Sequence, residues 1–513
     1  MKPCLATVML VVVAAAPAQD KLSGRIEAVT RGPDYKQAHW GILVADAESG
    51  KVVYEQHADR MFTPASTTKL YTCAAALGAF GPDYKFETPV YRRGEVQAGT
   101  LHGDLILVAS GDLTFGGRTA TNGKMQFTDS DHTYATSTST ATAVTETDPL
   151  TGLEDLAKQI RQAGIRQIND VLIDDRLFPA ARGTGSGPDQ LTPIVVNDNV
   201  VDLIIEPGSA AGTPATVRLR PDTAFVRADI QVQTAEKGTS PLIDVIPTGK
   251  QRFSVRGRIA AGSKPLVRVW NVDDPTAFAR ALFIEVLRRA GVAVAASPLA
   301  APGGELPERA GYDKLTRVAL FASPPLSETV KVTLKVSHNL YASTLPLLVA
   351  TKQGQTSLGA GLRWQRRCLL DLGVPVETIS VAGGAGGAQA DCVTPRATVK
   401  LLQMMRKRPE YAAWHAGFPI LGVDGTLADA VTAESPAKGK VQAKTGTLSW
   451  LDAMNGRTLL RSKALAGTMT TANGKELVFA MFVNDVPLPP GVTATREGRV
   501  MGKLCEIIYQ NGP

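Results

Sequence analysis

The stretch TPASTTKL, residues 63–70, decides how the rest of the chain is interpreted. Thr63 is a good N-cap and Pro64 suits the first helical position, so we expect a helix to begin here with Ser66 in its first turn. Ser66 and Lys69 are three residues apart and therefore share one face of that helix. A serine becomes nucleophilic when a base removes its proton, and a lysine can be that base if desolvation or another cation keeps it neutral. The stretch predicts a nucleophile with its base.

Two later motifs supply what this pair lacks. They are SHN at residues 337–339 and KTGT at residues 444–447, the second in a stretch with a strand pattern. Alone, Ser-x-x-Lys occurs by chance about once or twice in a chain of this size, and Ser-x-Asn is more often a helix cap. All three in this order predict one site, to which Lys444 brings the second cation. We expect no Ser-His pair at His338, because adjacent side chains on a helix point apart.

With these motifs the chain resembles the penicillin-recognising serine enzymes. Within them it is most similar to the class C low-molecular-mass penicillin-binding proteins, the D-alanyl-D-alanine carboxypeptidase/endopeptidase family. The distance from Ser66 to Ser337, 337 − 66 = 271 positions, fits that branch, whose members carry inserted domains between the two motifs. Other stretches that look like the family are residues 105–112, 172–175, 195–199, 422–427 and 479–484.

The resemblance implies an α/β (α+β) fold: a penicillin-binding, transpeptidase-like domain with a central antiparallel sheet flanked by helices, plus inserted β-rich lobes. The residues agree, because strand patterns at 40–45 and 51–54 form one pair, and a hairpin at 465–483 turns at Asn473-Gly474. We expect N- and C-terminal parts to share one sheet. The expected division is a catalytic domain at 19–90 and 305–513, an insert at 91–304, and a flexible loop near the polar, nearly featureless segment 117–150.

The resemblance also implies acyl transfer through a covalent intermediate, with no cofactor and no metal. Its substrates would be peptidoglycan stem peptides, and β-lactams would be covalent inhibitors. Ser66 would attack the carbonyl between two D-alanines, Lys69 would accept its proton, and Ser337 with Lys444 would relay a proton to the leaving amine. The resemblance implies further roles: Asn339 would hold the peptide amide, and the N–H groups of Ser66 and Thr447 would form the oxyanion hole. The hydroxyls of Thr445 and Thr447 would bind the terminal carboxylate, and Gly446 would let the substrate approach the strand closely.

One acidic residue is a further candidate. Asp174 ends an apolar strand pattern, and in the family an aspartate at this position contacts the free amino end of the stem peptide. A solvated carboxylate at a strand end explains the same pattern equally well. Both interpretations of Asp174 stay open at this point.

Two stretches depart from the family pattern. Where the family commonly has a loop like Asp-Gly-Ser-Gly, residues 382–387 read AGGAGG, with neither acid nor hydroxyl. Residues 452–463 look like an insertion before the hairpin strand. Three functional alternatives are left: a β-lactamase, a non-catalytic cell-wall-binding homologue, and within the family an endopeptidase rather than a carboxypeptidase.

The first residues indicate the compartment. Lys2 precedes an apolar run over residues 5–16 that ends in Ala-Pro-Ala, the pattern of a signal peptide over residues 1–18. We therefore expect secretion across the cytoplasmic membrane into the periplasmic or cell-wall space, as a soluble or peripherally attached protein without a transmembrane segment. The formal net charge of +7 suits an anionic wall polymer, and no basic run indicates nucleic-acid binding.

Four cysteines follow the signal sequence: Cys73, Cys368, Cys392 and Cys505. In an oxidising compartment they allow three connectivities if all pair. We expect Cys73 to stay free, because it lies with Leu70, Ala74 and Leu77 on the apolar face of the nucleophile helix. The cysteines and the six histidines show no metal-ligand spacing.

Overall fold

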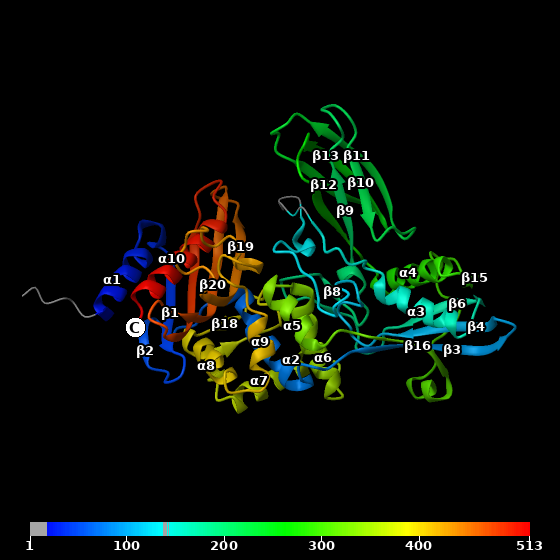
Figure 1. Ribbon diagram of the computed structural model, residues 1–513, viewed down its shortest axis with the longest axis horizontal. Coiled ribbons are helices and arrows are strands. Elements are labelled where there is room, and N and C mark those ends of the chain that lie inside the picture. Colours follow the sequence, from blue (N-terminus) through cyan, green and yellow to red (C-terminus); the bar gives the residue numbers. More distant parts are fainter. Residues whose placement is uncertain (1–17, 137–140, 142) are drawn as a thin grey trace, which may run out of the picture.

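The computed structural model describes residues 18–136, 141 and 143–513, so the expected signal peptide, apart from Ala18, lies outside it (Figure 1). An antiparallel sheet joins the two ends of the chain in the order β19-β20-β21-β1-β2. Val44 of β1 lies opposite Phe479 of β21. The predicted sharing of one sheet is thus confirmed. The strands are β1 (His39–Asp46), β2 (Val52–Gln56), β19 (Val441–Asp452), β20 (Arg457–Thr470) and β21 (Glu476–Pro487).

Helices cover both faces of this sheet. Helices α1 (Ala18–Thr30) and α10 (Thr495–Asn511) pack together on one face, where Phe479 and Met481 of β21 join their core. On the other face, Ala480 and Phe482 pack with a helical layer, because successive strand residues point to opposite faces. That layer contains α2 (Thr68–Phe80), α5 (Leu326–Lys335), α6 (Asn339–Lys352), α7 (Leu358–Asp371), α8 (Pro395–Met405) and α9 (Tyr411–Ala416).

The nucleophile helix starts differently from the prediction. A 3₁₀ turn, η2 (Ala65–Thr67), precedes α2, and Ala65 has a left-handed φ of 45°. Thr63 does not cap the helix: its N–H donates to Asn484 Oδ1 at 2.8 Å and its carbonyl accepts from Ser462 at 2.7 Å. The cap prediction is wrong because the sheet holds this segment. The apolar face that continues along α2 is buried as predicted.

The first inserted unit is a six-stranded sheet with the path β15-β5-β4-β3-β16, with β6 paired to β4. It extends past both expected limits of the insert, since β3 starts at Glu87 and β16 ends at Ala322. Helices α3 (Thr151–Gln162) and α4 (Pro275–Arg289) pack on it. The strands are β3 (Glu87–Gln97), β4 (Thr100–Val108), β5 (Gln167–Ile168), β6 (Asp170–Asp174), β15 (Ala293–Val294) and β16 (Thr316–Ala322).

Two three-stranded sheets, ordered β10-β9-β14 and β11-β13-β12, form a second inserted lobe at the top of Figure 1. The insert is therefore β-rich, as expected. Its strands are β9 (Val200–Glu206), β10 (Thr216–Arg220), β11 (Arg227–Ala235), β12 (Leu242–Gly249), β13 (Arg252–Ala260) and β14 (Leu266–Asn271). Short pairs are β7 (Ala181–Arg182) with β8 (Gln190–Leu191), and β17 (Ile379–Ser380) with β18 (Cys392–Val393).

Two segments differ from their sequence interpretation. Residues 452–463, expected to be an insertion, are the outer end of one long hairpin, because β19 runs to Asp452 and β20 begins at Arg457. In the segment 117–150, expected to be a flexible loop, Arg118, Met125 and His132 are buried. Residues 137–140 and 142 of that segment lie outside the described residues. The charged side chains of Arg118 and His132 are therefore part of the protein interior.

All four cysteines after Ala18 are free, with Cys73 and Cys505 buried. Over the part of the chain that the structure describes, every helix is too short or too polar to cross a membrane.

Candidate active site

Ser66 and Lys69 meet as their spacing predicts. Ser66 lies in η2 and is half-buried, whereas Lys69 lies in the first turn of α2 and is fully buried. The Lys69 Nζ is 2.7 Å from Ser66 Oγ, 2.7 Å from Asn339 Oδ1 and 3.0 Å from the Ala385 carbonyl oxygen. A neutral amine has two N–H donors and one lone pair. The two carbonyl oxygens can take the donors, which leaves the lone pair for the serine proton.

Burial lowers the pKa of Lys69 to about 7. Its three polar contacts among the described residues include no carboxylate, so none of them offsets the free-energy cost of burying an ammonium. A pKa near neutrality is what a general base needs, because a large fraction is then free to accept a proton.

The second and third motifs meet in the same way. Lys444 Nζ donates to Ser337 Oγ at 2.9 Å and to the Thr445 carbonyl at 2.8 Å. Burial, and then the positive charge of Lys69, hold the pKa of Lys444 well below its usual value. Ser337 has a left-handed φ of 63° just before α6. The structure therefore joins Ser66, Lys69 and Asn339 in one hydrogen-bonded set, and Ser337 with Lys444 in a second.

The glycine-rich loop 382–387 contributes a contact that the sequence did not indicate. It supplies the Ala385 carbonyl to Lys69, and a side chain at Gly386 would place its Cβ 1.9 Å from the Ala65 oxygen. Gly386 also has a left-handed φ of 87°. The loop thus needs glycine in order to lie directly against the nucleophile turn.

The KTGT strand forms the edge of the sheet. Thr445 Oγ1 donates to Thr426 Oγ1 at 2.7 Å, and the exposed Thr447 Oγ1 accepts from Lys463 Nζ at 2.9 Å. A Cβ at Gly446 would lie 2.6 Å from the Pro64 oxygen. The glycine is therefore required by packing against the nucleophile segment, a reason separate from the predicted approach of substrate.

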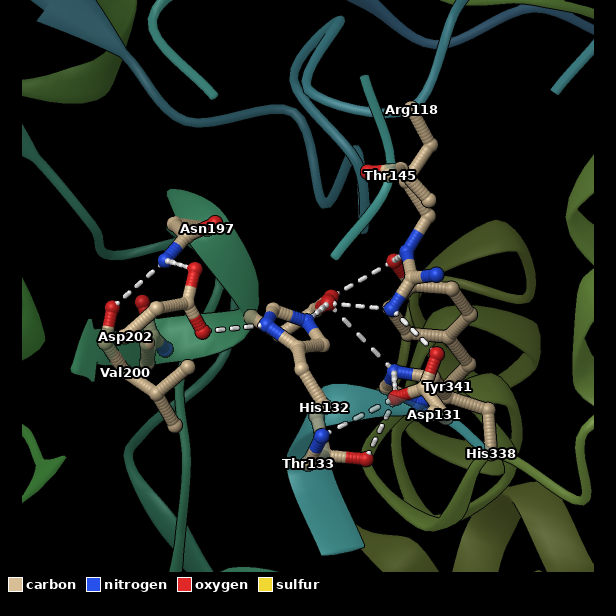
Figure 2. A network of polar contacts seen from close by, with 12 residues as sticks. Arg118, Asp131, His132, Thr133, Thr145, Asn197, Val200, Asp202, His338 and Tyr341 are labelled. Atoms are coloured by element: carbon tan, nitrogen blue, oxygen red, sulfur yellow. Dashed lines mark hydrogen bonds and ion pairs between the residues drawn. The ribbon is translucent and has the colours of Figure 1, made fainter. Parts of the chain in front are cut away.

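Beyond Ser337 lies a cluster of buried charges that sequence reasoning missed (Figure 2). Arg118 Nη2 bridges Asp131 at 2.8 Å and Asp198 at 2.7 Å. The His132 ring is bonded at both nitrogens, to Asp198 at 2.7 Å and to Asp202 at 2.5 Å. Although burial opposes its charge, Asp202 and Asp198 raise the pKa of His132 to about 10. These groups are fixed as ion pairs.

This cluster contacts the second motif directly. Asp198 Oδ1 accepts from Tyr341 Oη at 2.6 Å, and the ring of Tyr341 stacks on His338 with centroids 3.6 Å apart. His338 caps α6 through its ring, and the Tyr134 hydroxyl donates to the Ser337 carbonyl. His338 thus has a structural use, in agreement with the expected absence of a Ser-His pair. Residues 197–199, which carry Asp198, all have left-handed φ values, of 48°, 53° and 56°.

Asp131, His132 and Asp198 are close enough to hold a metal ion. Their arrangement does not fit one, because both His132 nitrogens already contact carboxylates and the Arg118 guanidinium neutralises the two acids. A metal ligand needs a free lone pair on the imidazole.

Asp174 is not part of this group. It ends β6 in the inserted sheet, where one oxygen accepts from Arg176 at 2.8 Å and the other from Tyr312 at 2.6 Å. Figure 1 shows β6 far from β19. A contact between Asp174 and substrate stays a prediction. A cavity of about 380 Å³ does adjoin Asn339, and its lining includes Tyr134, Asp189 and Asp273.

An α+β core with a serine, two lysines and a second serine in this arrangement defines a low-molecular-mass penicillin-binding protein. A sequence profile of the D-Ala-D-Ala carboxypeptidase 3 (S13) family matches residues 22–500, and the chain belongs to that family.

Proteins that are similar in sequence or in structure support this family assignment. The chain is 28% identical over 459 residues to a D-alanyl-D-alanine carboxypeptidase of Actinomadura sp. (strain R39), covering 84% of this chain and 77% of the relative. It is 25% identical over 458 residues to the D-alanyl-D-alanine carboxypeptidase DacB of Haemophilus influenzae, covering 86% and 85%. The fold matches the crystal structure of penicillin-binding protein 4 from H. influenzae with a TM-score of 0.68 and 22% identity, over 94% of this chain and 99% of that one.

Proposed function

We propose that this protein is a serine-type D-Ala-D-Ala carboxypeptidase/endopeptidase that acts on peptidoglycan stem peptides. The observation that carries the proposal is Lys69: a buried lysine without a carboxylate partner, 2.7 Å from the Ser66 hydroxyl. Family membership and the named activity of the relatives support the substrate class. A β-lactam complex of the H. influenzae relative supports covalent inhibition by β-lactams.

In the acylation step, neutral Lys69 takes the proton of Ser66 as Oγ bonds to the carbonyl carbon between two D-alanines. The N–H groups of Ser66 and Thr447 would stabilise the oxyanion, since an edge strand leaves backbone groups available to a substrate lying beside it. The C–N bond then breaks, and Ser337, backed by Lys444, passes a proton to the leaving nitrogen of D-alanine. Asn339 orients the peptide amide and Lys69.

Water completes the reaction by attacking the Ser66 ester, and the proton it loses returns to the hydroxyl of Ser66. The proton that Lys69 took in the first step replaces the one that Ser337 and Lys444 gave to the leaving amine. The terminal carboxylate of the substrate is assigned to the Thr445 and Thr447 hydroxyls. Secretion to the periplasmic or cell-wall space belongs to the same proposal, supported by the signal-peptide pattern of residues 1–18.

The test is labelling of the purified mature protein with a fluorescent penicillin, followed by peptide mass spectrometry. We expect a stable adduct on the Ser66 peptide, absent from Ser66→Ala and kept by Ser49→Ala, which removes an exposed hydroxyl outside the site. Turnover of penicillin without accumulation would indicate a β-lactamase instead. No reaction with well-folded protein would indicate a non-catalytic wall-binding homologue.

A further inference from the structure

Strand β20 carries three basic side chains, and one of them differs from the others. Arg457 Nε lies 2.9 Å from Asp452, and Arg461 pairs with Asp485. Lys463 has no such partner among the contacts of the described residues; its Nζ donates to Thr447 Oγ1 at 2.9 Å. A cation held on a hydroxyl of the active-site strand, rather than on a carboxylate, is available to an anion.

The sheet places Lys463 beside the third motif. Lys463 and Thr447 are directly opposite in the β19–β20 ladder, so both side chains project from the same face. Helix α10 packs on that face, where a Cβ at Gly498 would lie 3.6 Å from Lys463 Nζ. The nearby Glu497 is already engaged by Tyr35 and Arg496. The Lys463 ammonium therefore lies between α10 and the exposed Thr447, and it donates to the Thr447 hydroxyl.

The pair has the donors that a carboxylate needs. A hydroxyl that accepts from an ammonium keeps its own proton to donate, so Thr447 and Lys463 can both donate to one anion. Lys444 cannot supply that charge at the surface, because it is fully buried and donates to Ser337 Oγ and the Thr445 carbonyl.

We propose that Lys463 binds the free carboxylate of the substrate's C-terminal residue, together with Thr447, and so makes the enzyme prefer acids over the corresponding amides. This inference rests on the proposed function, since it assigns a residue to the carboxylate position of that reaction. Penicillins carry a carboxylate as well, so the same contact would assist their binding.

The protonation state of Lys463 provides a second test of this proposal. Burial lowers its pKa to about 8, and the charge of Glu497 opposes that shift; the other charged group coupled to it is Lys444. Lys463 is a cation below pH 8 and loses its charge as the pH rises through that value. The KM for an acid substrate should therefore rise above pH 8 in the wild type, and this rise should be missing when Lys463 is replaced.

The experiment compares diacetyl-L-lysyl-D-alanyl-D-alanine with its C-terminal carboxamide. For Lys463→Met we expect the KM of the acid to rise about tenfold with kcat within twofold of wild type, while the amide is unaffected. Lys463→Arg should restore most of the acid preference, because it keeps the charge. Lys503→Met, which removes an exposed lysine of α10, should change neither substrate and so controls for net charge.

Equal effects on acid and amide, or an unchanged KM for the acid, would overturn the assignment. If the Met variant does not fold, Lys463→Gln offers the same comparison with a polar side chain. Failure of the proposed function is a separate result: wild-type protein would then hydrolyse neither peptide and Ser66 would not be labelled by penicillin.

Discussion

On one side of Ser337, Lys69 and Lys444 are buried with hydroxyl and carbonyl partners, whereas on the other side Arg118 and His132 are buried against carboxylates. Both groups are removed from water, yet the pKa of Lys69 falls to about 7 and that of His132 rises to about 10. Burial alone therefore does not decide the protonation of a base in this protein. The partner decides it: a lysine without a counter-ion can accept a proton near neutral pH, whereas a histidine between two carboxylates keeps its charge up to about pH 10.

The largest expected effect comes from a substitution that prevents residue 69 from being neutral. Lys69→Arg keeps a positive charge at all accessible pH values, so the Ser66 proton has no acceptor. We expect the rate of labelling by fluorescent penicillin to fall by about 10³-fold or more. In the wild type that rate should increase with pH and level off above about 7, because only the unprotonated amine of Lys69 can accept the Ser66 proton.

Lys503→Arg, on the exposed side of α10, is the matched control and should label normally. If Lys69→Arg were labelled within tenfold of the wild-type rate, Lys69 would not be the base. The contrast between the two charge groups would then have no catalytic meaning.

A smaller effect, on stability, is expected from a substitution in the buried group of Arg118, His132 and their carboxylates. Asp198→Asn leaves Arg118 and His132 buried with one counter-ion fewer, which should lower the free energy of unfolding by about 3 kcal/mol. The raised pKa of His132 also makes the stability depend on pH. The contribution of His132 to the free energy of unfolding is complete below pH 6.5 and disappears as the pH rises through about 10. Urea unfolding of wild type and variant at pH 7 and 10 measures both.

Asp313→Asn changes an exposed acid without an ion-pair partner among the described residues and should cost little. A loss of less than about 1 kcal/mol in Asp198→Asn would mean that the cluster contributes no more than surface ion pairs do.

The smallest expected effect is at the boundary between the two groups. Tyr134→Phe removes the hydroxyl that donates to the Ser337 carbonyl, and one hydrogen bond contributes about 1 kcal/mol. We expect penicillin labelling to slow by about threefold to tenfold, since Ser337 is less firmly placed. Tyr84→Phe, outside the site, should label at the wild-type rate; equal rates in both variants would separate the cluster from catalysis.

The sequence predicts the part of the site that depends on local geometry. Three-residue spacing on a helix is enough to join Ser66 to Lys69, and hairpin signals at Asn473-Gly474 are enough to align β20 with β21. The resemblance then adds the pairing of Ser337 with Lys444 across 107 positions, which no local pattern contains. The resulting picture of the catalytic sheet and its main polar group agrees with the structure.

Long-range packing explains what the sequence did not predict. Arg118, Asp131 and Asp198 lie in polar stretches whose composition is typical of loops, and their pairing depends on segments up to 80 residues apart. Thr63 has the identity of a helix cap but is held by β21 through Asn484. In each case a tertiary contact overrides a local preference, which pattern and propensity do not describe.

The pairing of β1 with β21 also sets how much of the chain must exist before the central sheet can close. The two strands leave the ribosome 430 positions apart (476 − 46), a delay of roughly 20 to 90 s at ordinary rates of synthesis. Until β21 arrives, the Thr63 backbone lacks Asn484, and the turn that carries Ser66 has no sheet against which to take its shape. The sheet that holds the Ser66 turn can therefore close only once nearly the whole chain is present.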